Sequence, residues 1–342
     1  MNFYLKVFLI SFVGFLLLFA GILFAIDVIY SDPSSPSDVG VNDTTEATTE
    51  DGTEAYDDWL DEDEKTELWK IAEGSSRVNI LAFGLNEQLA DTIMLFSYDP
   101  ETNHTDVLSV PRDTYHYIEG YEDPALKKIN ATYGMPEIGG VNGMKRVLSE
   151  FLGVPIHYYL KVDFEAVKAV VDTLGGYEVT VPFDMDYDDS FQSLHIHLKK
   201  GYQVLNGEDT VKYLRFRKNN SGSISEGDVQ RIPRQQHFVN AMMTKAISGK
   251  LPAVINTIIG GKYVQTDMTI EKALKLAVQA AAMPPENIKF YMLEGEAKMM
   301  NHASYWIHDP YALEKTLYGF YGFNLDGETE TTETSTEATS GN

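Results

Sequence analysis

Short apolar runs and longer amphipathic segments alternate through the central part of the sequence. The runs at residues 78–83, 92–98 and 105–110 are rich in β-forming residues, and the turn-like residues 99–103 separate the second run from the third. Runs of this length between turn signals are typical of buried strands. We therefore expect three strands that follow one another along the chain.

Amphipathic segments follow these strands. Residues 140–152 and 164–174 place apolar side chains at helical spacing, and the second segment ends at Gly175-Gly176, before a β-forming run at 177–181. Glycine after the last apolar position is a common helix stop, because it adopts the left-handed backbone conformation without steric cost. This order predicts two helices and then a strand.

Two further segments lie among basic residues. Residues 211–217 alternate apolar and polar side chains, which predicts a strand, and residues 228–247 are spaced as a helix with Asp228 as its N-cap. Strands and helices in mixed order indicate an α/β fold with a central mixed β-sheet flanked by helices on both faces.

The N-terminal residues form a long apolar segment. Residues 7–26 contain no ionisable side chain, and Asp27 is the only one within residues 7–29, which is about the length that crosses a bilayer. Lys6 precedes the segment, so the positive-inside rule places residues 1–6 in the cytoplasm. We expect a retained single-pass signal-anchor helix at 7–29, with a cleaved signal peptide as the alternative.

Composition divides the rest of the chain into three parts. Residues 30–66 are acidic and rich in Ser, Pro and Thr, so we expect an extracellular linker there, and residues 324–342 form a Thr/Glu-rich tail that is expected to be disordered. No second linker of this kind interrupts residues 67–323, which we interpret as one folded domain.

The formal net charge of −24 is concentrated outside that domain. Residues 31–64 hold 13 Asp and Glu and residues 325–342 hold 5, with no Lys or Arg in either stretch, which leaves −6 for the remainder. An acidic domain argues against nucleic acid as a partner, because phosphate-backbone binding usually shows as a basic stripe. The absence of cysteine excludes disulfides, thiolate zinc sites and a cysteine nucleophile.

Arginine is scarce and unevenly distributed. The chain has seven, at positions 77, 112, 146, 215, 217, 231 and 234. On a strand Arg215 and Arg217 would share one face, and on a helix Arg231 would share a face with Arg234 and Gln235. Guanidinium groups brought together repel one another unless an anion joins them, and their planar fork suits phosphate. Two interpretations stay open: an anion site, and arginines paired with carboxylates at the surface.

A second polar group lies at the ends of the first predicted strands. Asp91 and Thr92 begin one strand, and the sequence Ser-Val-Pro-Arg-Asp-Thr at 109–114 follows the next. Strand ends are common ligand sites in α/β sheets. Asp91 is a candidate magnesium ligand or else a turn or cap residue. Arg112 could join the anion site, with Asp113 orienting it through an ion pair.

Two histidines and a run of aspartates form a separate group. His195 and His197 would share one face of a strand and could bind zinc, but the sequence shows no third ligand. Residues 184–188 resemble the start of a calcium-binding EF-hand loop, but Asp189 and His195 stand where that loop needs Gly and Glu. Neither metal site is expected from the sequence.

Several segments, in order along the chain, resemble the LytR-CpsA-Psr family. They cover residues 78–250 and continue more weakly to about 310. The segments are NILAFG, ADTIMLFSYDPET, LSVPRDTY, KINATY, GVPIHYYLKVDFEAVKAVVDTLGGYEVTVP, LKKGYQVLNGEDTVKYLRFRK and GDVQRIPRQQ. Each segment is weak alone, but their combination is specific.

The resemblance implies site residues position by position. Pyrophosphate would be bound by a set of arginines with neighbouring polar residues: Arg112, Arg215, Arg217, Arg231 and Arg234, with Gln235 beside them and Lys128 and Asn130 at the edge. Asp91 matches an aspartate implicated in magnesium binding, so Mg²⁺ is the implied cofactor, and Asp91 and Arg112 are the implied catalytic residues. The family often has an earlier aspartate where this chain has Asn86, which offers a neutral oxygen and a weaker magnesium ligand.

The resemblance also implies an activity and a location. Members of this family transfer anionic glycopolymers, such as wall teichoic acid or capsular polysaccharide, from undecaprenyl pyrophosphate to peptidoglycan. The implied reaction is attack of a muramic acid 6-hydroxyl on the sugar-linked phosphorus, with undecaprenyl phosphate leaving. An extracellular catalytic domain on a single-pass anchor in the cell membrane, in an envelope of the Gram-positive type, is the implied arrangement. We also expect an apolar channel for the lipid near the arginines.

Two other functions are compatible with the same residues. A polyprenyl-pyrophosphate hydrolase would direct water to the same phosphorus. A non-catalytic protein would bind or regulate the lipid-linked glycan, an alternative that Asn86 keeps open.

Overall fold

The computed structural model describes residues 63–190, 194–250, 253–254, 257, 264–281 and 283–325. The predicted anchor at 7–29 lies outside these residues, as do most of the predicted linker and tail. Every described residue belongs to one unit of the chain, Asp58–Asn342. Among the described helices, none combines the length and the apolar character needed to span a membrane.

A six-stranded mixed sheet forms the centre of the fold, in the order β10-β3-β2-β1-β4-β9. Its strands are β1 (Val78–Asn86), β2 (Leu89–Asp99), β3 (His104–Ser109), β4 (Tyr158–Val162), β9 (Val264–Thr266) and β10 (Ile288–Met292). β2 pairs antiparallel with β1 and β3, β4 and β10 pair parallel with β1 and β3, and β9 pairs antiparallel with β4. The three successive strands expected from the apolar runs are confirmed.

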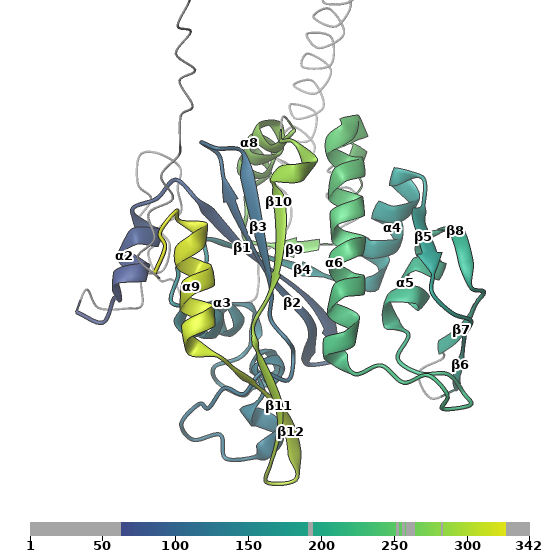
Figure 1. Cartoon of the computed structure of the whole chain (residues 1–342). Helices are drawn as coiled ribbons and strands as arrows, with labels where there is room; N and C mark the ends of the chain where they lie inside the picture. The colour runs from purple at the N-terminus through teal and green to yellow at the C-terminus, as the bar shows by residue number, and fades with distance from the viewer. Residues whose placement is uncertain are drawn as a thin grey trace, which may run out of the picture. The chain divides into compact units, whose positions relative to one another are not determined.

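Helices cover both faces of this sheet (Figure 1). One face carries α2 (Glu67–Glu73), α3 (Gly140–Leu152) and α9 (Pro310–Phe320), and the other carries α6 (Asp228–Lys245) and α8 (Ile270–Ala280). Because side chains alternate along a strand, β2 supplies Ile93 and Leu95 to the first core and Met94 and Phe96 to the second. The α/β fold class, with a mixed central sheet between helices, is therefore confirmed.

A smaller layer beside the sheet has its own apolar core. It contains α4 (Phe164–Leu174), α5 (Gly207–Arg215) and two antiparallel strand pairs, β5 (Tyr177–Val181) with β8 (Gly201–Leu205) and β6 (Met185–Asp189) with β7 (Leu194–Leu198). Tyr177 and Phe216 are fully buried in this core. α4 ends as predicted at Gly175, whose φ of 83° lies in the left-handed region.

Short helices and one further strand pair complete the described chain. They are η1 (Pro124–Lys127), η2 (Ile129–Gly134), η3 (Ala246–Lys250), η4 (Pro285–Asn287), β11 (Gly295–Met300) and β12 (Ala303–His308). The backbone N–H of Asn130 in η2 donates to the Arg112 carbonyl at 3.2 Å, and the N–H of Trp306 in β12 donates to the Asp113 carbonyl at 2.9 Å. These bonds hold the turn that carries Arg112 from two sides.

The strand predicted at 211–217 is wrong, because helix α5 occupies most of this segment. The Asn206 side chain caps the helix by accepting from the backbone N–H of Asp209 at 2.8 Å. The buried positions 207, 210 and 211 follow helical spacing, but only the last of them lies within the predicted strand. The alternation of apolar and polar residues at 211–217 therefore indicated the wrong element. Consequently Arg215 ends a helix and Arg217 lies beyond it.

The helix predicted at 228–247 is confirmed as α6, with a different cap. Its first residue is Asp228, and the N-cap position is taken by Gly227, which makes no side-chain capping bond. Asp228 therefore lies one position inside the helix rather than at its N-cap, and its side chain is outside the described part of the structure.

Candidate functional site

A cavity of about 1190 Å³ lies between the sheet and helices α6 and α8. Its apolar lining includes Met94, Phe96, Val167, Leu214, Phe238 and Leu276. Along β2 the lining runs from Asp91 to Tyr98, which is about 23 Å at the rise of an extended strand. Small-molecule pockets usually have about 300–1,000 Å³, so this cavity has room for a longer apolar chain. An apolar cavity therefore lies beside the arginines, where we expected a channel for the lipid.

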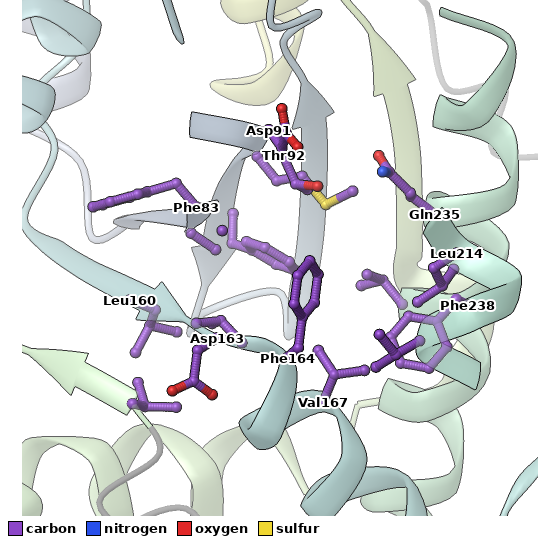
Figure 2. Close-up of a pocket in the computed structure, with 18 of the residues that line it drawn as sticks. Phe83, Asp91, Thr92, Leu160, Asp163, Phe164, Val167, Leu214, Gln235 and Phe238 are labelled. Carbon is purple, nitrogen blue, oxygen red and sulfur yellow. The ribbon is translucent and has the colours of Figure 1, made fainter. Parts of the chain in front are cut away.

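Polar side chains gather at one end of this cavity. Figure 2 shows Asp91 and Thr92 on β2, with Gln235 of α6 across from them, while Phe164, Leu214 and Phe238 surround the apolar part. The polar end lies where β2 begins and β3 has just ended. Both strand ends therefore supply side chains to one site, as the sequence predicted.

Asp91 is the centre of the polar end. Arg112 Nη1 contacts one oxygen of the Asp91 carboxylate, and Arg217 Nη2 lies 3.8 Å from the other. The side chains of Asp91 and Arg112 are only 19% and 17% exposed, so water screens their attraction less than it would at the surface. Asp91 thus draws together two arginines from segments that are far apart in sequence.

The predicted ion pair between Arg112 and Asp113 is wrong. Asp113 instead pairs with Lys128, whose Nζ lies 2.8 Å from the carboxylate. Arg112 and its neighbour Asp113 point to different partners because the turn after β3 sends consecutive side chains in different directions. The orienting carboxylate for Arg112 comes from β2, not from the adjacent residue.

Arg215 and Arg231 add two more guanidinium groups to the cavity lining. Arg215 ends α5 and lies over the Phe164 ring, 4.8 Å from the ring centroid. Burial lowers the pKa of Arg215 from its ordinary value, while the nearby carboxylate of Asp91 opposes that shift. Arg231, on the first turns of α6, is 5% exposed. Arg231 therefore lies at a buried site and Arg215 at a half-buried one.

The described part of the cavity lining carries an excess of positive charge. Four guanidinium groups and the Lys218 ammonium face the cavity, against the carboxylates of Asp91, Asp163, Asp189 and Glu226. Glu226 forms an ion pair with Arg234, so its charge is compensated from outside the lining. A compact anion with several oxygens suits this arrangement, because each guanidinium can donate two parallel hydrogen bonds.

Arg234 occupies a different position from the other predicted arginines. It donates to the carbonyls of Tyr213 at 3.2 Å and Phe216 at 3.1 Å, and its guanidinium contacts Glu226. It is not part of the described cavity lining. Arg234 therefore ties α6 to the end of α5, next to the residues that carry Arg215 and Arg217.

Lys128 and Asn130 also lie outside the lining. Lys128 pairs with Asp113 and lies 5.8 Å from the Tyr305 ring centroid, while Asn130 is 4% exposed and bonds through its backbone to the Arg112 carbonyl. Their contacts hold the turn that presents Arg112. The side chain of Asn86, the other residue predicted near magnesium, falls outside the part of the chain that the structure describes.

Three residues in or beside the cavity were missed from the sequence. Phe164 stacks below Arg215, Asp189 lines the cavity from β6, and Gln236 bonds to Ser109 Oγ at 3.0 Å, which joins α6 to β3. Phe164 opens α4, where its apolar character indicated only helix packing. Asp189 follows the run that resembles a calcium-binding loop, and no local pattern links it to the arginines.

The donor set at this end fits a magnesium ion. Mg²⁺ in proteins commonly takes one or two carboxylates together with phosphate oxygens of the substrate. Asp91 and Asp189 supply carboxylates to the same cavity lining as the arginines. No cysteine is present to favour a softer metal.

Comparisons with known proteins show what the chain is similar to. The chain is 31% identical over 250 residues to the polyisoprenyl-teichoic acid–peptidoglycan teichoic acid transferase TagV of Bacillus subtilis, covering 71% of this chain and 62% of that relative. It is 30% identical over 257 residues to the protein named TagU in Oceanobacillus iheyensis, covering 72% and 76%. The crystal structure of Bacillus subtilis TagV superposes with a TM-score of 0.58 at 28% identity, over 72% of this chain and 98% of that one.

The similarity extends over most of the domain that contains the cavity. The chain spans about 62% of the length of the TagV relative, so the two proteins are not matched from end to end. Residues 44–319 match the LytR_cpsA_psr family as a whole, which is more than half of the chain. The resemblance seen in the sequence is therefore confirmed, and this protein belongs to the LytR_cpsA_psr family.

Proposed function

We propose that this protein transfers an anionic glycopolymer, such as wall teichoic acid or capsular polysaccharide, from undecaprenyl pyrophosphate to peptidoglycan. The observation that carries the proposal is one cavity with two environments, guanidinium groups around Asp91 and an apolar lining that continues to Tyr98. A lipid-linked pyrophosphate has the same two parts in the same order. The names of the TagV and TagU relatives support this activity.

The arginines bind the pyrophosphate in this proposal. Arg112, Arg215 and Arg231 come from three separate segments of the chain and line one cavity. Because Arg231 is buried and Arg215 is half-buried, their hydrogen bonds to phosphate oxygens, those of Arg231 above all, are stronger than the same bonds at the surface. The apolar lining takes the first isoprenoid units of the carrier, which adds binding free energy through the hydrophobic effect.

The transfer itself is a displacement at phosphorus. A peptidoglycan hydroxyl, the muramic acid 6-hydroxyl in our proposal, attacks the phosphorus linked to the sugar, and the bond from that phosphorus to the bridging oxygen breaks. Undecaprenyl phosphate leaves with the bridging oxygen. Negative charge grows on that oxygen, and guanidinium groups already directed at it lower the barrier without reorganising.

Asp91 has two roles in this proposal. Its carboxylate is held in place by Arg112 and Arg217, and it receives the proton of the attacking hydroxyl. Asp91 and Asp189 would also hold Mg²⁺, which supplies further positive charge to the phosphate oxygens when bound.

The proposed location is the outer face of the cell membrane. A single-pass anchor at residues 7–29 and an acidic linker at 30–66 would hold the domain near its lipid substrate, in an envelope of the Gram-positive type. Lipid-linked glycan, peptidoglycan and the membrane are the partners in this proposal. The acidic composition gives no support for nucleic acid as a partner.

A reconstituted transfer reaction tests the proposal. The full-length chain is incubated with an undecaprenyl-pyrophosphate-linked glycan, Mg²⁺ and a peptidoglycan oligomer, and the products are identified by mass spectrometry. We expect a phosphodiester-linked glycan on the oligomer and an equal amount of undecaprenyl phosphate. Release of the glycan phosphate into water, with no linked product when acceptor is supplied, would replace the transferase with a hydrolase. Binding of the lipid without turnover would indicate a non-catalytic protein.

A further inference from the structure

The β6–β7 strand pair carries a group of histidines and aspartates on its outer face. Asp186 pairs with His197 across the two strands, and Asp188 pairs with His195. Side chains alternate along each strand, so these four are exposed, while Ile196 between the histidines is fully buried. The group is separate from the cavity, because none of the four lines it.

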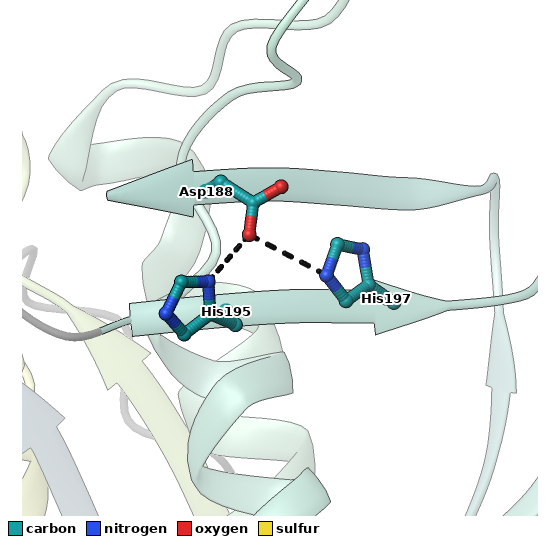
Figure 3. A group of neighbouring side chains, drawn as sticks. All are labelled: Asp188, His195 and His197. Carbon is teal, nitrogen blue, oxygen red and sulfur yellow. Dashed lines mark hydrogen bonds and ion pairs between the residues drawn. The ribbon is translucent and has the colours of Figure 1, made fainter. Parts of the chain in front are cut away.

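Three of these side chains converge on one point (Figure 3). His195 Nδ1 lies 2.5 Å from Asp188 Oδ1, and His197 Nε2 lies 3.4 Å from the same oxygen. All three ligand atoms lie within 4.8 Å of one another. Asp188, which the strand pairing places opposite His195, is a third candidate ligand that the sequence did not reveal.

The fourth residue fixes the orientation of one histidine. Asp186 Oδ1 lies 2.6 Å from His197 Nδ1, a hydrogen-bond distance. A neutral imidazole has one N–H, so donating it to Asp186 leaves the Nε2 lone pair directed toward Asp188. A cation between His197 Nε2 and Asp188 Oδ1 would be coordinated by both atoms. Metal-binding histidines commonly donate their second nitrogen to a carboxylate in this way.

We propose that Asp188, His195 and His197 bind a divalent zinc ion, with Asp186 holding His197 in position. Ligand atoms about 2.0–2.1 Å from a tetrahedral ion are separated by roughly 3.3 Å. The 3.4 Å between Asp188 Oδ1 and His197 Nε2 already has this separation. The shorter contact of His195 opens by rotation of side chains that are 57% and 43% exposed. Two imidazoles and one carboxylate suit zinc better than magnesium, and three ligands leave a position for water.

The site would brace the strand pair against a loop at the cavity. The side-chain oxygens of Asn219 and Asn220 accept from the backbone N–H groups of Asp186 and Asp188, at 3.1 and 2.9 Å. Those asparagines lie in the loop between Arg217 and α6. A bound ion that cross-links β6 to β7 therefore restrains the segment next to the arginines without touching the substrate.

Calorimetric titration of the metal-free full-length chain with Zn²⁺ tests the site. We expect one ion per chain with micromolar or tighter affinity. The His195→Ala and Asp188→Ala variants should each weaken binding at least about tenfold, and Asp186→Asn should weaken it by roughly 10- to 100-fold, since the outer carboxylate orients the ligand. His302→Ala, which removes an exposed histidine between β11 and β12, is the matched control and should bind as the unmodified chain does.

Two further comparisons separate this site from the cavity. The Asp91→Asn variant should retain the zinc site unchanged, and the variants of the strand pair should unfold at the same temperature as the unmodified chain when EDTA is present. Affinity weaker than micromolar, or unchanged affinity in both His195→Ala and Asp188→Ala, overturns the proposal. Loss of the binding event in Asp91→Asn also overturns it, because the ion would then belong to the cavity. The zinc titrations and the unfolding measurements do not use glycan transfer, so their outcome does not depend on the proposed activity.

Discussion

The guanidinium of Arg112 contacts the carboxylate of Asp91 across the junction between two neighbouring strands. Asp91 lies near the start of β2 and Arg112 lies just beyond the end of β3, and because the strands are antiparallel these two places meet. The pair joins the two residues that the family resemblance marks as catalytic. It also places a negative charge inside a group of arginines, so removing that charge should affect binding and turnover differently.

The Asp91→Asn variant should separate these two effects. Without its charge the arginines attract a diphosphate more strongly, so we expect the affinity for a prenyl pyrophosphate in EDTA to be unchanged or higher. Turnover in the presence of Mg²⁺ should fall by about 10²- to 10⁴-fold, as for loss of a general base. Calorimetry and the transfer assay measure the two quantities. A variant that loses binding and turnover in the same proportion would contradict the role given to Asp91.

Arg231 should contribute strongly to diphosphate binding, because its side chain is buried at the polar end of the cavity. Truncation in Arg231→Ala removes charge-assisted hydrogen bonds worth about 2 kcal/mol, or roughly 30-fold in affinity. The control is Arg146→Ala on α3, where the arginine is 61% exposed and pairs with Glu150. Equal affinities for the two variants, measured by calorimetry with a soluble prenyl pyrophosphate, would remove Arg231 from the site.

Arg234 should act on stability more than on binding. It is 8% exposed and joins Glu226 and two backbone carbonyls, so Arg234→Ala leaves the Glu226 carboxylate without this partner. Breaking a buried ion pair from one side costs about 3–5 kcal/mol. Urea unfolding should show this loss, while the affinity of the folded protein should fall less than in Arg231→Ala. Unchanged unfolding with abolished binding would instead support the pyrophosphate-binding role that the resemblance implies.

His157 should make stability depend on pH. Burial lowers the pKa of His157 to about 4, and Lys145 adds to the shift. Above pH 6.5 the ring is neutral in both the folded and the unfolded chain. As the pH falls below 6.5, the ring takes up a proton in the unfolded chain before it does so in the folded chain. The free energy of unfolding therefore decreases until the pH has passed the folded pKa. Between pH 7 and pH 5 this group should contribute a loss of about 2 kcal/mol. Urea unfolding of the unmodified chain and of His157→Gln at pH 7 and pH 5 isolates the contribution of His157. The free energy of unfolding of the variant should fall less between the two pH values. The same decrease in both proteins would assign the effect to other groups.

Much of the fold was predictable because each of the first three strands is a continuous run of apolar, β-forming residues. The runs at 78–83, 92–98 and 105–110 form β1 to β3, and the amphipathic segments at 140–152, 164–174 and 228–247 form α3, α4 and α6. The strand predicted at 211–217 was wrong because an alternation of only a few residues is compatible with either period, and the capping Asn206 precedes that segment. The pairing of distant strands decided the sheet order, which local patterns do not encode.

The composition of the site was predicted better than its internal contacts. Five predicted side chains line the cavity with Asp91, namely Arg112, Arg215, Arg217, Arg231 and Gln235. Arg234 could not be told from them, because helical spacing alone does not say which face meets the cavity and which meets α5. The partner of Arg112 was also missed, since Asp113 is adjacent in sequence while Asp91 is adjacent only through strand pairing.

The central claim is that one cavity binds both the pyrophosphate and the lipid, and affinity as a function of chain length tests it most directly. We would measure the binding of prenyl pyrophosphates from five to twenty carbons to the full-length chain. Each buried methylene contributes about 0.8 kcal/mol, so affinity should rise at least about tenfold along the series. In Ala277→Trp the indole would fill part of the cavity beside α8, so affinity should stop rising at a shorter chain length. Val278→Trp, on the exposed side of α8, should show the same rise as the unmodified chain. Affinity that is independent of chain length, or unaffected by Ala277→Trp, would contradict the claim.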